Sequence, residues 1–481
     1  MTTTTPPVAP PAPAVATTVA PPPAEPPTSL APAWHDLVIT GGRVIDPDSG
    51  TDAMMDVGID GAAVTALSAE RLRGRTTIDA TGQVVAPGFI DLLSYDPNPY
   101  GVPFKVADGV TTNLCMHGIN DDPGPWFAAR LAEPTPVHHG GAFDHAWARS
   151  RLGVGVHERA APLQVEALRT SAAAALAGGF IGVHLELEYT PGVALDEVVA
   201  MASVAAASQV PALFHARHSD PLPPGTNAEA LEEVIAVARA TGAAVHVEHL
   251  TSTGGTRTMA ASLAALQAAR DEGLDVTGDL YPYDSWATYA GSTRFDAGWQ
   301  ERFAIGYGDL LVPGTSARLT PATFAAARRA NDLVAAMAIP EEDVRAGLRS
   351  PILMLGSDAI LEPGDNNHPR AAGTFARVLG RYVRDERLLG LPAALAKMTI
   401  QPARRLEAGA PAMRRKGRLS LGADADITVF DPATVADRAT LERPAQASTG
   451  ITWVLVEGVV VRDPDGPRPD ARPGRAIRSG A

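Results

Sequence analysis

Short strand-like runs at both ends of the chain enclose a long middle in which strand-like and helix-like segments alternate. Residues 35–46 form two apolar runs that are joined by a Gly-Gly turn. Residues 425–431 and 451–458, near the other end of the chain, are also short apolar runs. Short apolar runs bounded by turn residues are typical of strands. We therefore predict one small β-sandwich domain assembled from both chain ends, residues 34–86 and 416–465.

The middle of the chain repeats a strand, a helix and a glycine-containing turn. Ala-rich segments of helix length occur at residues 161–177 and 228–241, and each is followed by glycine. Apolar runs of strand length lie between them, for example residues 211–215. Such repetition indicates a parallel sheet covered by helices. The length of this region, residues 87–415, favours a closed (β/α)8 TIM-type barrel, so the predicted fold class is α/β.

Three segments do not follow this rhythm. Residues 294–349 are mostly helical in pattern, and we predict an insertion over one end of the barrel, either a lid or a plain structural excursion. Residues 1–33 are rich in Pro, Ala and Thr and cannot bury enough apolar surface to offset the entropy of ordering. We predict a disordered tail there, and a second flexible tail at residues 466–481.

Composition narrows the class of protein. The 481 residues are 45% hydrophobic, which suffices for a large core, and the formal net charge is −14. This charge argues against nucleic-acid binding, which needs a clustered basic face. The single cysteine, Cys115, excludes an internal disulfide and fits a reducing compartment. Because no apolar run approaches the roughly 20 residues that span a bilayer, and no signal-peptide pattern precedes the first strand, we expect a cytoplasmic protein without a membrane partner.

Three predicted strands end at a residue that suits metal chemistry, namely His215, His249 and Asp358. In a parallel barrel the carboxyl ends of the strands converge on the active site. Neutral imidazoles bind zinc, and an adjacent aspartate can accept the proton of an attacking water. Each residue alone would more often be a buried structural histidine or a helix cap. Together, at equivalent strand ends, they indicate a hydrolase-type metal pocket.

A further run of polar residues lies within one predicted strand. His184, Glu186 and Glu188 share one face, because side chains alternate along a strand. If this face looks into the barrel, Glu186 is a candidate metal ligand or acid–base group, with His184 beside it. Alternatively the outer residues cap the strand ends, and Glu186 pairs with an arginine such as Arg217.

Several motifs resemble those of a known enzyme family. Residues 84–91, Val-Val-Ala-Pro-Gly-Phe-Ile-Asp, resemble the first barrel strand of the amidohydrolase superfamily. Residues 368–380, which begin His-Pro-Arg, are very similar to the N-acyl-D-amino-acid deacylase (D-aminoacylase) family. The same family is matched by Tyr281-Pro282-Tyr283, Lys397-Met398-Thr399, Gln401-Pro402-Ala403 and residues 422–427. The resemblance extends from about residue 35 to residue 462.

This resemblance implies a zinc-dependent barrel enzyme that hydrolyses N-acyl-D-amino acids or related amides. The tight zinc site of that family uses two histidines, which correspond to His215 and His249, and a cysteine. Asp358 corresponds to the catalytic aspartate. Arg370 would bind the substrate carboxylate, because a guanidinium matches its bidentate geometry. Tyr283 would hydrogen-bond the same group or the scissile carbonyl.

The sequence departs from the family pattern at both metal positions. The His-x-His pair expected after the first strand is replaced by Leu93 and Tyr95, so a second metal is not expected, and Tyr95 becomes a candidate substrate-binding residue. The expected Asn-Cys-Gly is Met-His-Gly at residues 116–118. The third zinc ligand is therefore either His117 or Cys115, which are both suitable. Thr251 replaces a lysine that the family usually offers.

We therefore predict a mononuclear zinc-dependent amidohydrolase, a hydrolase of C–N bonds other than peptide bonds. Its small substrate would be an N-acyl amino acid or a related amide with a carboxylate, and Asp358 would be the general base. One alternative is a repurposed barrel that catalyses a cyclisation or lyase step through His184 and Glu186. Another is a non-catalytic binding protein. The sequence leaves a homo-oligomer open.

Overall fold

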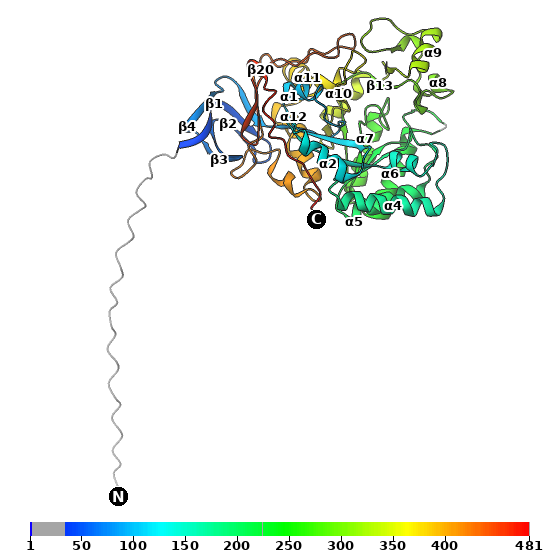
Figure 1. Cartoon of the computed structure of the whole chain (residues 1–481), viewed down its shortest axis with the longest axis horizontal. Coiled ribbons are helices and arrows are strands. Elements are labelled where there is room, and N and C mark those ends of the chain that lie inside the picture. The colour runs from blue at the N-terminus through cyan, green and yellow to red at the C-terminus, as the bar shows by residue number, and fades with distance from the viewer. Residues whose placement is uncertain (2–33, 224, 481) are drawn as a thin grey trace.

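A (β/α)8 barrel and a smaller sheet domain lie side by side in the computed structural model, which describes Met1, residues 34–223 and residues 225–480 (Figure 1). The predicted disordered tail, residues 1–33, lies outside the described residues apart from Met1. Within the described residues, no helix is long and apolar enough to cross a membrane.

Eight parallel strands form the barrel sheet, in the order β16-β12-β11-β10-β9-β8-β7-β6. Between its first and last strands, the backbone N–H of Asp358 donates to the Leu93 carbonyl at 2.7 Å. The sheet is thus nearly closed, and the predicted barrel is confirmed. The strands are β6 (Phe89–Asp91), β7 (Val110–Ile119), β8 (His138–Asp144), β9 (Val183–Glu186), β10 (Ala212–His215), β11 (Val245–Val247), β12 (Val276–Leu280) and β16 (Leu353–Leu355).

Helices cover the outside of the barrel, and α6 (Asn227–Thr241) illustrates why the sequence places them there. Thr226 and Glu229 form a capping box at its start, and Gly242 ends it with a left-handed φ of 67°. Its buried positions follow the helical repeat: Leu231, Val234, Ile235 and Ala238. The other helices are α1 (Val102–Ala107), α2 (Pro123–Ala132), α3 (His145–Arg151), α4 (Pro162–Ala177), α5 (Leu195–Ala207), α7 (Met259–Asp271), α10 (Glu341–Arg349), α11 (Arg370–Arg377), α12 (Leu391–Met398) and α13 (Ile400–Leu406).

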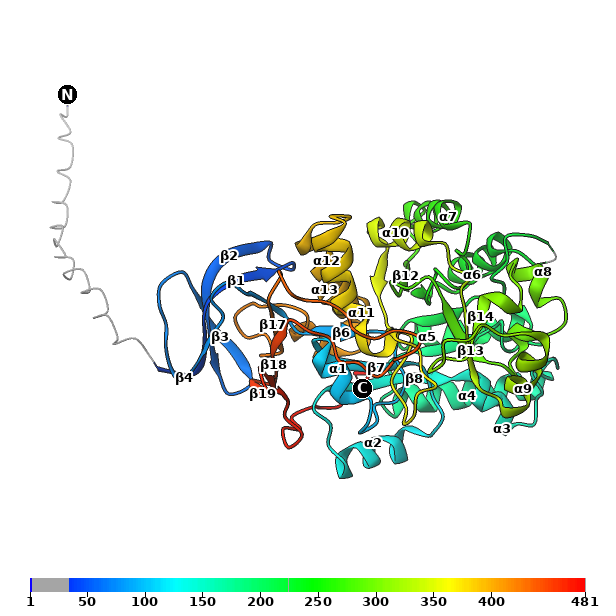
Figure 2. The same cartoon turned by 90° about the horizontal axis from the view of Figure 1, so that it is seen from above.

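The second domain is a nine-stranded sheet built from both ends of the chain, on the opposite side of the molecule from α8 and α9 (Figure 2). Its central pairing joins β17 antiparallel to β5, with Ile427 opposite Pro87. Because β5 leads directly into the first barrel strand, this pairing fixes the C-terminal strands at the base of the barrel. The strands are β1 (Trp34–Asp46), β2 (Thr51–Asp60), β3 (Ala63–Ser68), β4 (Arg73–Asp79), β5 (Val84–Pro87), β17 (Ile427–Phe430), β18 (Ile451–Val456), β19 (Val459–Asp463) and β20 (Gly466–Pro467).

The insertion in the barrel differs from the expected helical segment 294–349. It begins at β13 (Trp286–Tyr289), which forms a three-stranded sheet with β14 (Leu310–Leu311) and β15 (Leu333–Ala336). Strands of two to four residues are too short for alternation to reveal them. At the other end, α10 packs against α7 and β12 and is a barrel helix rather than part of the insertion. The insertion also carries α8 (Trp299–Phe303) and α9 (Pro321–Ala330).

The C-terminal segment is ordered by contacts with the barrel, which corrects the expectation of a flexible tail at residues 466–481. Ala476 forms a parallel bridge with His139, and the side chain of Ile477 is 1% exposed. The backbone N–H of Ile477 donates to the His139 carbonyl at 2.7 Å. A single apolar residue and a few backbone hydrogen bonds leave no periodic pattern, so this docking is not visible in the sequence.

Candidate active site

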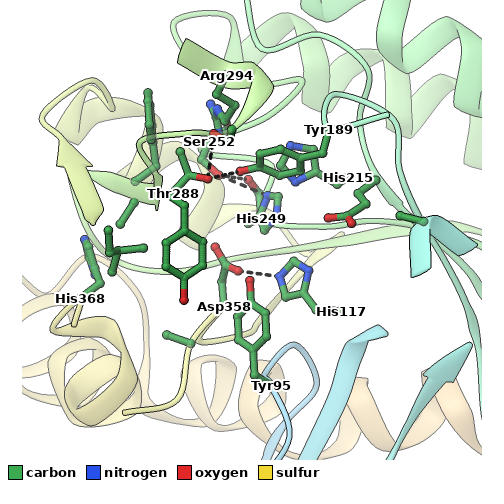
Figure 3. Close-up of a pocket in the computed structure, with 18 of the residues that line it drawn as sticks. Tyr95, His117, Tyr189, His215, His249, Ser252, Thr288, Arg294, Asp358 and His368 are labelled. Atoms are coloured by element: carbon green, nitrogen blue, oxygen red, sulfur yellow. Dashed lines mark hydrogen bonds and ion pairs between the residues drawn. The ribbon is translucent and has the colours of Figure 1, made fainter. Parts of the chain in front are cut away.

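A cavity of about 640 Å³ lies at the carboxyl ends of the barrel strands (Figure 3). Glu186 and His215, the last residues of β9 and β10, line it, as does His249 just after β11. The insertion contributes Trp286 and Arg294 to the opposite wall. The insertion therefore encloses the cavity that the barrel opens.

Asp358 occupies the centre of the polar cluster. Its Oδ1 accepts a hydrogen bond from His117 Nε2 at 2.5 Å, and its Oδ2 lies 2.8 Å from the Arg370 guanidinium. Burial opposes its ionisation, but the charge of Arg370 and the hydrogen bond from His117 help to outweigh burial and hold the pKa of this carboxyl well below its ordinary value. The Asp358 carboxyl is therefore ionised at neutral pH.

The ring of His117 lies between the Tyr95 and His249 side chains (Figure 3). It stacks on Tyr95 with a centroid distance of 4.8 Å and on His249 at 5.4 Å. Tyr95, expected among the substrate-binding residues, lines the cavity, whereas Leu93 is fully buried below it. The segment after β6 thus presents the Tyr95 ring to the cavity.

Three side chains in the cluster are close enough to share one metal ion. Ligand atoms of His117, Glu248 and His249 all lie within 4.8 Å of one another. Burial lowers the pKa of His249 well below its ordinary value, so its imidazole is neutral and has a lone pair to offer. Glu248 is fully buried, and burial raises its pKa. Neutral imidazoles and a carboxylate are suitable ligands for a divalent ion.

His215 lies beside this cluster, with its ring centroid 4.7 Å from that of His249. Its Nε2 donates to Glu188 at 2.9 Å, and burial lowers its pKa to about 4. Burial acts to raise the pKa of Glu188, but Arg294 and His215 together lower it to about 2. The predicted residues His215, His249 and Asp358 therefore line one cavity, but this nitrogen of His215 faces a carboxylate.

The strand face that carries His184 and Glu186 is divided between two environments. Glu186 lines the cavity, and burial raises its pKa to about 7. His184 is fully buried beneath the cavity, and its Nε2 donates to Glu248 at 3.1 Å. Its ring meets His117 edge-on at 5.2 Å. Of this pair, only Glu186 is placed to touch a substrate.

Two further predicted site residues, like His184, do not line the cavity. Cys115 is buried in the main hydrophobic core, where its Sγ donates to the Gly118 carbonyl at 3.2 Å and burial raises the thiol pKa. The alternative ligand, His117, is the residue that the structure brings to the cluster. Tyr283 packs behind His368 under the Arg377 guanidinium, whereas Tyr281 lines the cavity and lies 4.5 Å below the guanidinium of Arg370.

Glu248 belongs to this cluster but is not predicted from the sequence. This residue precedes His249, and adjacent residues of a strand point to opposite faces. The strand β11 ends at Val247, however, so Glu248 and His249 lie in a turn where alternation no longer holds. Both His249 and Asp358 have left-handed φ values, 32° and 52°. Such backbone strain often accompanies functional sites.

Comparison with known proteins places the chain. The sequence pattern of the amidohydrolase family matches residues 108–462. The chain belongs to the amidohydrolase family. This amidohydrolase is 35% identical to N-acyl-D-glutamate deacylase of Alcaligenes xylosoxydans xylosoxydans over 93% of its own length and 97% of the relative's. It is 29% identical to D-aminoacylase of the same organism, over 89% and 94% of the two chains.

Solved structures of the same type match the fold of this amidohydrolase. N-acyl-D-glutamate deacylase from Bordetella bronchiseptica, complexed with zinc and a phosphonate inhibitor, aligns with a TM-score of 0.80 at 31% identity. The alignment covers 93% of this chain and 100% of that one. A D-aminoacylase structure aligns with the same TM-score at 26% identity, over 92% and 100%. The predicted resemblance to the D-aminoacylase family is confirmed, and the protein is a hydrolase of non-peptide C–N bonds.

Proposed function

We propose that this amidohydrolase hydrolyses the amide bond of N-acyl amino acids with one zinc ion in the cavity. The observation that carries the proposal is the ionised Asp358 carboxylate, which lies between His117 and Arg370 beside a metal-capable cluster. The names of two relatives that span nearly the whole chain support this substrate class.

The donor set fits a divalent ion. His117 and His249 would hold it, with His215 beside them, and the buried oxygen Glu248 Oε1 has no hydrogen-bond partner among the described residues. A zinc ion bound there would polarise the amide carbonyl and make a water nucleophilic at neutral pH. One ion is proposed because Leu93 and Tyr95 replace the ligands that a second ion would take from the first strand.

The acid–base work falls to two carboxylates. Asp358 remains ionised at neutral pH and accepts the proton of the attacking water. Glu186, whose pKa is raised to about 7, is partly protonated at that pH and donates a proton to the departing amine. The two groups are therefore biased toward opposite roles by their surroundings.

Arg370 binds the carboxylate of the substrate in this proposal. Its guanidinium is buried at the cavity wall, and the Tyr281 ring below it restricts its orientation. A guanidinium held in this way can form two parallel hydrogen bonds to a carboxylate. The substrate would displace part of the Arg370–Asp358 pair and free Asp358 for proton transfer.

The test is release of free amino acid from a panel of N-acetyl amino acids, in D and L series, by the zinc-loaded protein. We expect hydrolysis of at least one series and none of the matched N-acetyl amines, which lack the carboxylate. Arg370→Lys keeps the charge but cannot form two parallel hydrogen bonds to a carboxylate, so KM should rise about tenfold or more. Equal hydrolysis of acids and amines would contradict the role of Arg370, and no hydrolysis at all would refute the proposed function.

A further inference from the structure

We infer that Glu248 is a direct ligand of the metal, so that His117, Glu248 and His249 hold the ion in a thiolate-free site. The ligand atoms of these three residues form one of the two groups among the described residues that are close enough for a shared ion. In the other group, His138, Asp426 and Glu457, the Lys416 ammonium already lies 2.9 Å from His138 and from Asp426. The inference rests on the proposed metal site.

The Glu248 carboxylate is buried and has few polar partners among the described residues. Its side chain is 0% exposed, and one oxygen has no hydrogen-bond partner among the described residues. The other oxygen accepts from His184 and lies 3.8 Å from His117 Nδ1. No lysine or arginine forms an ion pair with it in the described part of the chain. A buried carboxylate is costly unless it is paired or binds a metal, so this oxygen fits a metal ligand.

The turn after β11 holds Glu248 and His249 in place. The Glu248 carbonyl accepts a hydrogen bond from Thr253 Oγ1 at 3.0 Å, and the His249 N–H donates to Asp279 Oδ1 at 2.7 Å. His184 is the positioning residue, because its Nε2 bonds the second oxygen of Glu248. Hydrogen bonds of this kind orient a ligating side chain before the metal arrives.

The sole cysteine does not compete for this role. Cys115 belongs to the buried hydrophobic core and does not line the cavity, and its Sγ donates to the Gly118 carbonyl at 3.2 Å. Glu248 supplies the negative charge that a thiolate would otherwise bring. The resulting set of two imidazoles and one carboxylate contains only nitrogen and oxygen donors.

Cobalt spectroscopy tests the donor set without reference to turnover. Metal-free full-length protein is titrated with Co²⁺, and its absorption is recorded. We expect visible bands of bound Co²⁺ and no near-ultraviolet band of sulfur-to-cobalt charge transfer. Cys115→Ala should give the same spectrum. A charge-transfer band that disappears in Cys115→Ala would overturn the inference.

Metal affinity tests Glu248 itself. Glu248→Gln keeps the shape but removes the charge, and its zinc affinity should fall by more than the roughly 10–100-fold loss typical of removing an outer partner. Glu186→Gln, a neighbouring cavity carboxylate outside the cluster, should bind zinc as the parent does, and circular dichroism checks that both variants fold. Unchanged affinity in Glu248→Gln would overturn the inference even if the parent hydrolyses amides. Tight metal binding that depends on Glu248, without any amide hydrolysis, would instead refute the proposed function alone.

Discussion

At the scale of single residues, three carboxylates in or beside the cavity differ in the direction in which their surroundings shift their pKa. Asp358 faces Arg370 and His117, so its pKa is lowered, whereas Glu186 has burial as its main influence and its pKa is raised to about 7. Glu188 is ionised against Arg294 and His215. Environment alone thus gives these three carboxylates different ionisation behaviour, and the base and proton-donor roles proposed for Asp358 and Glu186 follow from that difference.

The raised pKa of Glu186 gives a pH-dependent stability. The folded state holds its proton between pH 4.5 and about 7, where the unfolded chain has released it, so this residue makes unfolding easier as pH rises through that window. Glu186→Gln removes the effect. In metal-free protein we expect the variant to gain about 2 kcal/mol over the parent on going from pH 5 to pH 8, measured by urea unfolding. A difference that does not change with pH would show that burial does not perturb Glu186.

At the scale of elements, the insertion is joined to the barrel by polar contacts at the cavity wall. Thr288 of β13 accepts a hydrogen bond from the Tyr189 hydroxyl at 2.9 Å, and Thr293 donates to the Glu188 carbonyl at the same distance. Arg294 lies over the Trp286 ring and donates to the Ser252 carbonyl at 3.0 Å. These contacts fix one wall of the cavity to the turns that follow β9 and β11.

Mutation can measure the contribution of the Arg294–Glu188 ion pair to the stability of this junction. Arg294→Met leaves Glu188 buried without its cation and should destabilise the protein by about 3–5 kcal/mol. The double variant Arg294→Met/Glu188→Gln should recover part of that loss, because no unpaired charge remains. Denaturant unfolding of the two single variants and the double variant gives the coupling. If the losses of the two single variants simply add in the double variant, the 3.5 Å ion pair of Arg294 and Glu188 makes no contribution to the free energy of unfolding.

At the scale of the whole molecule, a buried ionic cluster joins the sheet domain to the base of the barrel. Lys416 is 2% exposed and donates to Asp424 and Asp426, both at 2.9 Å. Asp426 also accepts from His138, the first residue of β8. Arg475 of the C-terminal segment reaches Glu457 in the same cluster. Barrel, sheet domain and C-terminus therefore meet at one set of paired charges.

Removing the central cation should weaken the whole assembly. Lys416→Met leaves two buried carboxylates without their ammonium, and we expect a loss of about 3–5 kcal/mol in the free energy of unfolding. The control is Arg43→Met, which breaks the exposed pair with Asp52 and should cost less than about 1 kcal/mol. Similar losses in the two variants would contradict the role of the cluster.

The barrel could be predicted from the sequence because each strand and helix has its own periodic signal. The meeting of His215, His249 and Asp358 in one cavity could be predicted because all three lie at or just after the ends of barrel strands. The position of Glu248 in the cluster could not be predicted, because the direction of its side chain depends on the residue at which β11 ends. The motif Tyr281-Pro282-Tyr283 predicts Tyr283 in the site, but Tyr281 lines the cavity and Tyr283 packs against His368 outside the lining. The short strands of the insertion and the docking of Ile477 depend on tertiary contacts, which leave no local pattern.

The measurement that tests the account most directly is a metal titration of the metal-free protein, followed by amide hydrolysis. Zinc is added in steps to a known concentration of protein, and hydrolysis of an N-acetyl amino acid is measured at each step. One metal held by the His117 cluster predicts that activity rises linearly and reaches its plateau at about one equivalent. Activity that requires two equivalents, or activity that is complete without metal, would contradict the one-metal site.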